Sequence, residues 1–408
     1  MKHFLIVLTV LVCVLSSSSA QEIRFSGQLR ERSELDAKSF RMGQNPDVFH
    51  LLRTRLKALA RLNSNVQVTV EVQDARTFGQ KKSTLNTGSP AFDLRQGYVE
   101  VASLNESAFG FRLGRQVLAW GNERLIGPIE WNNFSQSFDA GMVTYRAGAV
   151  SAEVFGAAVA RNDNGTSYNR DVFATGLAAA WKPAGTGSTA QLLFVFDNPK
   201  DTAVRQNRFT TWLQVQGVYG GFDYSIDGAY QFGDYIARNG TLSIGAHMIG
   251  LRAGYTIDEG SALRIGIGFD RLSGKDPDPA SETYGVFNTL YASNHAKYGH
   301  MDYFPSTALD LGLNDLYFQI GVKPAGSFGL NADVHVFSTA TDPSALPGAS
   351  PDVTASIGME LDTYVTWTVA EAVQMSAGYA VFDGAKDRVV LPGRKTTNWA
   401  YAMTTVNF

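Results

Sequence analysis

The chain has 408 residues, of which 18% are charged and 44% hydrophobic, with 40 glycines, one cysteine and a formal net charge of −3. It is too apolar for a disordered polymer and has too few cysteines for a disulfide-stapled domain. Because 35 basic residues are balanced by 38 acidic ones, the composition argues against wholesale nucleic-acid binding. The many glycines and aromatic residues (25 Phe, 16 Tyr and 6 Trp) favour β structure.

The first twenty residues have the layout of a secretory signal peptide. A short positive start is followed by an apolar stretch, 4–15, and by small residues that end at Ala20. The apolar stretch is too short for a stable membrane anchor, and Cys13 lies inside it. We therefore predict that residues 1–20 are cleaved and that residues 21–408 form a single exported domain without cysteine.

After residue 20, apolar and polar residues alternate with a period of two along most of the chain. No window of about 18 uncharged apolar residues follows, so no transmembrane helix is predicted. In 66–73, for example, four valines alternate with polar residues. Alternation over about ten residues, bounded by turn residues, is typical of transmembrane strands, and a closed barrel satisfies every backbone group in lipid. Similar alternation occurs at 23–34, 51–62, 263–269, 316–322 and 328–336.

The predicted connections between strands alternate between short and long. Short ones are expected near 63–65, 105–107, 183–188, 220–221, 258–261 and 324–327, and long ones near 35–49, 76–93, 119–138, 161–172, 198–207, 233–241, 272–312, 339–353 and 384–396. This asymmetry, with a terminal Phe408, distinguishes an outer-membrane barrel from a β-sandwich array or a propeller. We predict an all-β transmembrane antiparallel barrel of about 18 strands, with 16 as the alternative, short periplasmic turns and long external loops.

The polar faces of the first two predicted strands are cationic, and such faces line the lumen of a barrel. Their basic residues are Arg30, Arg32, Arg53, Arg55, Lys57 and Arg61. Arg112, Arg146 and Arg264 are expected on the inward faces of later strands. Arginine stays charged and binds carboxylates through two parallel hydrogen bonds, and rings of basic residues favour anions in a pore.

The same arginines could instead brace the barrel wall through pairs with carboxylates on neighbouring strands. Inward carboxylates are expected at Glu34, Glu71, Glu100, Asp270, Asp333, Glu360 and Asp362. For each arginine, bracing and substrate contact are therefore both open. On the first two strands Glu31 lies on the opposite face and does not neutralise the cluster, which favours an anion path.

Two segments resemble the alginate export porin family. Residues 113–127 read LGRQVLAWGNERLIG and are followed by Glu130-Trp131-Asn132-Asn133 and by SFDA at 137–140, similar to a G-R-Q…G-x-x-R…W…F-D signature. Residues 287–304 read FNTLYASNHAKYGHMDYF, similar to F-N-x-L-Y…N-H…Y-G-x-M-D-Y-F. With 358–362 and Gly378-Tyr379, the similarity spans most of the mature chain.

The resemblance implies an outer-membrane barrel of 18 strands in which an Arg-rich constriction conducts an anionic polyuronate. The matched charged positions are Arg115, Arg124, Asp139, His295 and Asp302. We expect Arg115 and Arg124 in the constriction, because the segment after the fifth strand can fold inward; bracing of a loop with Glu123, Glu130 or Asp139 is the alternative. His295 and Asp302 are expected to pin the 272–312 segment, and His295 with His300 lacks a third metal ligand at a usable spacing.

The sequence thus predicts a channel in the outer membrane of a Gram-negative-type bacterium. It is either an anion-favouring passive conduit for an acidic polysaccharide (an alginate-like polyuronate) or its oligomers, or a general diffusion porin for small sugars and ions. Expected partners are the anionic saccharide, outer-membrane lipid and an export or uptake partner in the periplasm. No nucleophile with a base is recognisable, so no enzyme activity, cofactor or metal is expected. No pattern indicates the direction of transport, the solute, the resting state of the pore or the oligomeric state.

Overall fold

The computed structural model describes most of the chain after residue 21. The described ranges are 22–41, 43–79, 92–160, 172–200, 204–258, 260, 262–305, 310–350, 352–387, 390–393 and 395–408. The predicted signal peptide, with Cys13, lies outside them, as does most of the predicted 161–172 loop. Among the described residues the one helical segment is a 3-10 turn, η2 (Pro343–Ala345), and no helix is long and apolar enough to cross a membrane.

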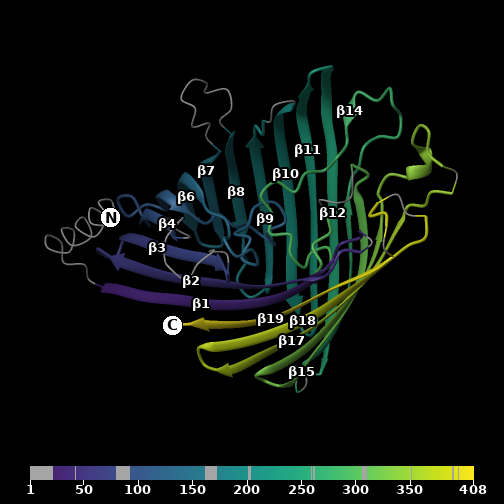
Figure 1. The fold of residues 1–408 in the computed structure, drawn as a ribbon. Coiled ribbons are helices and arrows are strands. Elements are labelled where there is room, and N and C mark those ends of the chain that lie inside the picture. The colour runs from purple at the N-terminus through teal and green to yellow at the C-terminus, as the bar shows by residue number, and fades with distance from the viewer. Residues whose placement is uncertain are drawn as a thin grey trace.

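Eighteen long antiparallel strands form one closed barrel, which confirms the predicted fold and strand number (Figure 1). They are β1 (Glu22–Ala37), β2 (Asp47–Arg61), β3 (Val66–Thr77), β4 (Phe92–Val101), β5 (Phe109–Gln116), β6 (Phe138–Ala147), β7 (Val150–Ala160), β8 (Val172–Trp181), β9 (Ser188–Asp197), β10 (Val204–Tyr219), β11 (Phe222–Ala237), β12 (Gly240–Asp258), β13 (Leu263–Leu272), β15 (Leu313–Ala325), β16 (Phe328–Ser338), β17 (Ser356–Ala370), β18 (Val373–Gly384) and β19 (Thr396–Asn407). The two-residue β14 (Thr283–Tyr284) lies in the β13–β15 connection and pairs in parallel with β12.

The barrel closes where the first strand meets the last. Each long strand pairs with the next one along the chain, and β1 pairs with β19 over ten register positions that begin at Gln28 and Asn407. Figure 1 shows the purple β1 and the yellow β19 side by side. Phe408 continues this seam through two backbone hydrogen bonds to Gly27, of 2.6 and 3.0 Å. Because β1 and β19 pair, the described strands form a sheet that closes on itself, and neighbouring strands satisfy one another's backbone groups.

The period-two pattern decides which side chains face outward. Phe25, Leu29 and Leu56 are exposed on the outer surface, whereas Arg30 and Arg53 on the same strands are buried inside. Apolar residues therefore face the lipid and charged residues face the lumen, as the alternation predicts.

One predicted connection is wrong. The segment 233–241 is not a long loop, because β11 and β12 continue as a ladder to the pair Ala237 and Gly240 and are joined by residues 238–239 alone. Gly233 and Asp234, which suggest a turn, lie within β11. Gly233 has a φ of 123° there, and it pairs in register with Ile244.

Candidate pore constriction

Residues 117–137, between β5 and β6, fold into the barrel and follow its inner wall; we call them the first inner loop. The first part of the loop contacts β7, β9 and β11 in turn, through Trp120 to Glu153 (2.7 Å), Gly121 N–H to Gln191 (3.1 Å) and Asn122 to Asp227 (3.2 Å). The later part returns to β2 and β3, where the side chain of Asn133 donates to the carbonyls of Leu52 and Arg76. The loop therefore narrows the lumen along much of its circumference.

Five arginines from β1, β2 and β4 hold the returning part of this loop, and we call them the cationic wall. They are Arg30, Arg32, Arg53, Arg55 and Arg95, all at most 8% exposed. Arg30 and Arg53 donate to the carbonyl of Glu130 at 2.7 and 2.9 Å, and Arg32 donates to the carbonyl of Trp131 at 2.6 Å. The Glu130 carboxylate pairs with Arg53 (3.2 Å), Arg55 (2.7 Å) and Arg95.

The cationic wall keeps an excess of positive charge. Its carboxylate partners are Glu34, Glu71 and Glu130, so five guanidinium groups are matched by three carboxylates. Burial opposes ionisation of Glu130, but Arg55 and Arg95 outweigh it and hold the pKa of this loop carboxyl below its ordinary value. Two positive charges of the cluster therefore lack a matching carboxylate among these groups.

Residues 286–305, part of the β13–β15 connection, also fold inward; we call them the second inner loop. The two inner loops are joined by three backbone hydrogen bonds: Gly127 N–H to Tyr291 O (3.0 Å), Tyr291 N–H to Leu125 O (2.8 Å) and Ser293 N–H to Glu123 O (3.0 Å). Their side chains stack as well, since the rings of Trp131 and His295 lie 3.9 Å apart and nearly parallel, while Arg32 covers the other face of Trp131 at 3.9 Å. The two loops therefore form one collar inside the barrel.

The opposite side of the lumen is acidic, and we call it the acidic wall. It consists of Asp227, Asp270, Asp315, Asp333, Glu360 and Asp362, on β11, β13 and β15–β17, all at most 5% exposed. Glu360 accepts the N–H of Met301 at 2.8 Å and Asp362 that of His300 at 3.2 Å. A Cβ at Gly299, whose φ is +82°, would lie 2.5 Å from Glu360, so only glycine lets the second inner loop approach this closely.

Arg124 of the first inner loop is buried in the acidic wall. It pairs with Asp270 at 2.7 Å and with Asp227 at 3.6 Å, and it donates to the hydroxyl of Tyr298 at 3.0 Å. Burial alone would lower the pKa of Arg124, but Asp270 and the other acidic neighbours hold it well above its ordinary value. Nearby Lys297 has fewer compensating groups, and burial, with repulsion from Arg124, lowers its pKa to about 8.

The remaining lumen arginines predicted from the sequence form pairs on the inner wall. The pairs are Arg61 with Glu22 (3.2 Å), Arg112 with Glu100 (3.0 Å), Arg146 with Glu153 (3.9 Å) and Arg264 with Asp223 (2.8 Å). Lys57 follows Arg55 on the same face of β2 and lies opposite Glu71 in register. Most of the predicted arginines thus contact a carboxylate, a geometry that fits bracing of the wall.

The expectation that Arg115 and Asp139 line the pore is corrected, because the structure does not place these residues in the constriction. They pair with each other at 3.0 Å across β5 and β6. Arg115 shares its face of β5 with Leu113, and Asp139 shares its face of β6 with Val143; both apolar residues are more than half exposed. This ion pair therefore lies on the outer face of the barrel, and only Arg124 of the two candidate constriction arginines is inside.

Arg95 was missed because a β-bulge interrupts the alternation of β4. Glu71 pairs with Gln96 and Val72 with Leu94, so Arg95 is an extra residue that points inward. His295 and Asp302, which we expect to pin the 272–312 segment, contact each other within the second inner loop, with 2.8 Å between Nδ1 and Oδ2. Among the described residues no group of three or more His, Cys, Asp or Glu is placed to hold a metal ion.

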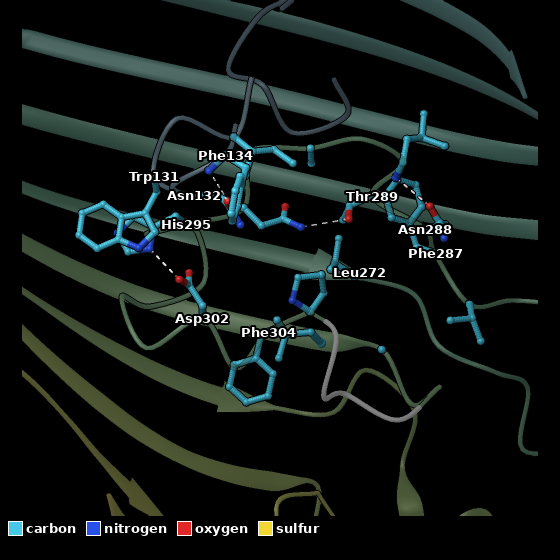
Figure 2. Close-up of a pocket in the computed structure, with 18 of the residues that line it drawn as sticks. Trp131, Asn132, Phe134, Leu272, Phe287, Asn288, Thr289, His295, Asp302 and Phe304 are labelled. Carbon is cyan, nitrogen blue, oxygen red and sulfur yellow. Dashed lines mark hydrogen bonds and ion pairs between the residues drawn. The ribbon is translucent and has the colours of Figure 1, made fainter. Parts of the chain in front are cut away.

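On the long-loop side, the collar borders a cavity of about 1130 Å³, which we call the outer cavity (Figure 2). It is lined by β1 and β2, both inner loops and the start of β15. Arg32 of the cationic wall also lines the outer cavity, so the cavity and this wall adjoin each other.

Several solved barrels share this fold at low sequence identity. OccK11 (OpdR) of Pseudomonas aeruginosa matches with a TM-score of 0.62 and 13% identity, over 95% of this chain and 96% of that chain. OccAB1 of Acinetobacter baumannii matches with 0.62 and 11%, over 96% and 99%, and Pseudomonas aeruginosa OpdK, solved with vanillate, with 0.62 and 10%, over 95% and 99%. A comparison with curated proteins found no match.

The family model described as alginate export matches residues 21–385, nearly the whole described barrel. Together with the fold, this match indicates a porin-like, non-enzymatic channel in the outer membrane of a Gram-negative-type bacterium, through which polysaccharides or small solutes pass. The chain belongs to the alginate export family.

Proposed function

We propose that this protein is an anion-favouring passive conduit for an acidic polysaccharide, such as an alginate-like polyuronate, or for its oligomers. The observation that carries the proposal is the cationic wall, in which five inward arginines meet three carboxylates at the narrowed part of the lumen. We also propose that residues 1–20 direct export and are cleaved, and that a periplasmic partner delivers or receives the saccharide.

The cationic wall would act on a passing anion mainly through its field. The arginines are covered by the first inner loop, but charges in a low-dielectric wall set the potential of the adjoining lumen. An excess of positive charge lowers the barrier for carboxylates. The acidic wall across the lumen keeps the attraction weak, so a carboxylate chain can leave as well as enter.

A general diffusion porin for small sugars and ions is the second candidate, and one observation favours it. The five arginines are bonded to loop carbonyls and to Glu130, and this leaves little guanidinium surface for a substrate. In this alternative the inward charges only hold the collar in place. The fold is compatible with small solutes, since OpdK, a barrel of similar fold, was solved with vanillate, which is not a polymer.

Single-channel recording in planar bilayers separates the two candidates. For the wild type we expect a reversal potential in a salt gradient that indicates anion preference, and block by polyuronate added to one side. Both should be lost in the Arg53→Glu/Arg55→Glu variant, because four charge units change at the cationic wall. Arg115→Glu, a charge reversal on the outer face, is the matched control and should keep both properties. Cation preference in the wild type, without polyuronate block, would reject the conduit and favour the general porin.

A further inference from the structure

The outer cavity has the size and position of a binding site. Its volume of about 1130 Å³ exceeds the range of roughly 300–1,000 Å³ typical of pockets for drug-sized ligands, so it has room for more than one sugar ring. Figure 2 shows the side chains of both inner loops around it. Its walls come from segments far apart in the chain, which fix one another through the collar.

The charged side chains that line the outer cavity are of both signs, and among the described lining residues carboxylates outnumber Arg and Lys by three to two. Arg32 pairs with Glu34 at 2.7 Å, and His295 with Asp302 at 2.8 Å, an interaction drawn in Figure 2. Lys275 and Asp310 add one charge of each sign to the lining. The uncharged polar side chains are those of Asn132, Asn133, Ser273, Asn288, Thr289 and Asn294. This chemistry suits hydroxyl groups better than carboxylates.

Phe134 supplies the apolar surface that a sugar ring requires. Both faces of Trp131 are covered, by Arg32 and by His295, whereas the Phe134 side chain is 60% exposed. The backbone of Phe134 is fixed on both sides, because its N–H donates to Asn132 at 2.9 Å and its carbonyl accepts from Gln73 at 2.7 Å. The ring is therefore presented to the cavity from a fixed position.

Asn294 supplies an acceptor that lacks a donor. Its Nδ2 donates to the hydroxyl of Thr289 at 3.2 Å, while its buried Oδ1 has no hydrogen-bond partner. An unsatisfied buried acceptor costs free energy that an incoming O–H donor would recover. A hydroxyl-bearing ligand in the outer cavity is such a donor.

We propose that the outer cavity binds the uncharged, hydroxyl-bearing parts of sugar rings and so holds a saccharide at the long-loop face of the collar. The proposal rests on the proposed saccharide function and extends it: the cavity recognises hydroxyl groups and ring faces, and the cationic wall acts on the carboxylates. Neutral oligosaccharides therefore bind here as well as acidic ones.

Isothermal titration calorimetry on the full-length protein in detergent tests this assignment without requiring conduction. The probes are maltohexaose, which is neutral, and a polyuronate hexamer. We expect both to bind the wild type, and the Phe134→Ala and Asn294→Ala variants to bind both about three- to tenfold more weakly, the scale of one aromatic contact or one hydrogen bond. Leu104→Ala, in a short turn at the other end of the barrel, is the control and should bind as the wild type does.

The outcomes separate this proposal from the proposed function. Absence of maltohexaose binding, or equal affinities in the wild type and in both cavity variants, overturns the assignment of the outer cavity, while polyuronate block in bilayers would still support the conduit. Maltohexaose binding that the cavity variants weaken supports the assignment even if polyuronate fails to block. Thermal unfolding of each variant shows whether it folds, and the conservative Phe134→Tyr should restore binding if the ring itself is the contact.

Discussion

The cationic wall and the acidic wall hold the same collar, but the cationic wall binds its backbone carbonyls and the acidic wall binds its backbone N–H groups. On the cationic wall, Arg30, Arg32 and Arg53 donate to backbone carbonyls of the first inner loop. On the acidic wall, Glu360 and Asp362 accept backbone N–H groups of the second inner loop. Irregular backbone inside a barrel needs such partners, because the wall strands have already used their own backbone groups.

This difference shows that charged side chains in the lumen hold the two inner loops in place, apart from any effect on solutes. A chain with 35 basic and 38 acidic residues looks neutral, yet its buried inner surface has an excess of arginines on β1, β2 and β4 and an excess of carboxyl groups on β11, β13 and β15–β17. The acidic wall even places carboxyl groups opposite each other, since Asp270 pairs in register with Asp315 and Asp333 with Asp362. Arg124 and His335, which contact these carboxylates, compensate for the repulsion.

The largest effect is expected from removal of Arg124, the cation that joins the first inner loop to the acidic wall. Arg124→Met leaves Asp270 and Asp227 buried without their partner, a change that typically costs about 3–5 kcal/mol. We expect the collar to detach on this side, with a several-fold rise in single-channel conductance and a lower thermal unfolding midpoint. Arg124→Lys, which keeps the charge, should show a smaller rise. Unchanged conductance in Arg124→Met would mean that Arg124 does not hold the collar.

A smaller effect is expected from Glu130, the carboxylate shared by three arginines of the cationic wall. Glu130→Gln keeps the shape of the side chain and the backbone carbonyls that bind Arg30 and Arg53. The collar should therefore stay in place while the excess positive charge rises by one. We expect the reversal potential to shift toward stronger anion preference, by an amount that falls with salt concentration. A shift toward cations would contradict the proposed electrostatic role of the wall.

Lowering the pH should change the wild-type channel in the same direction as the Glu130→Gln substitution does. The pKa of Glu130 lies below its ordinary value of 4.5, so its contribution to collar stability is complete above pH 4.5 and is lost as the pH falls through the lowered pKa. The part of the anion preference that depends on Glu130 should be constant above pH 4.5 and should rise below it, as this carboxylate is protonated. In Glu130→Gln this component should be missing, because the titrating carboxyl is gone. Equal pH profiles for the two proteins would exclude Glu130 as the group.

Much of the barrel wall could be predicted from the sequence, because in every strand lipid-facing and lumen-facing residues alternate. Alternation, turn residues and loop lengths determine the number of strands and the inward position of residues such as Arg53 and Asp270. The alternation fails where the backbone departs from it, as at Arg95 in the bulge of β4. At Arg115 the alternation holds: Arg112 and Arg115 are three positions apart on β5, so they face opposite sides of the wall.

The constriction depends on contacts that no local pattern contains. The stack of Arg32, Trp131 and His295 joins residues from β1 and both inner loops, up to about 260 positions apart in the chain. The two segments that resemble the family, 113–140 and 287–304, include most of both inner loops. The second segment also contains His295 and Asp302, which contact each other. Which strands these segments contact is decided by the closed barrel as a whole, through side chains such as Glu360 and Gln231.

The smallest effects are expected from two ion pairs on β5 that differ mainly in the face they occupy. Arg112 pairs with Glu100 on the lumen side and Arg115 pairs with Asp139 on the outer side, each at 3.0 Å. Partly exposed pairs of this kind contribute about 0–1 kcal/mol, so neither Arg112→Ala nor Arg115→Ala should change the unfolding midpoint much. Reversal potentials should still separate them, because only loss of Arg112 removes a positive charge from the lumen. A shift with Arg115→Ala as large as with Arg112→Ala would refute the assignment of inner and outer faces at β5.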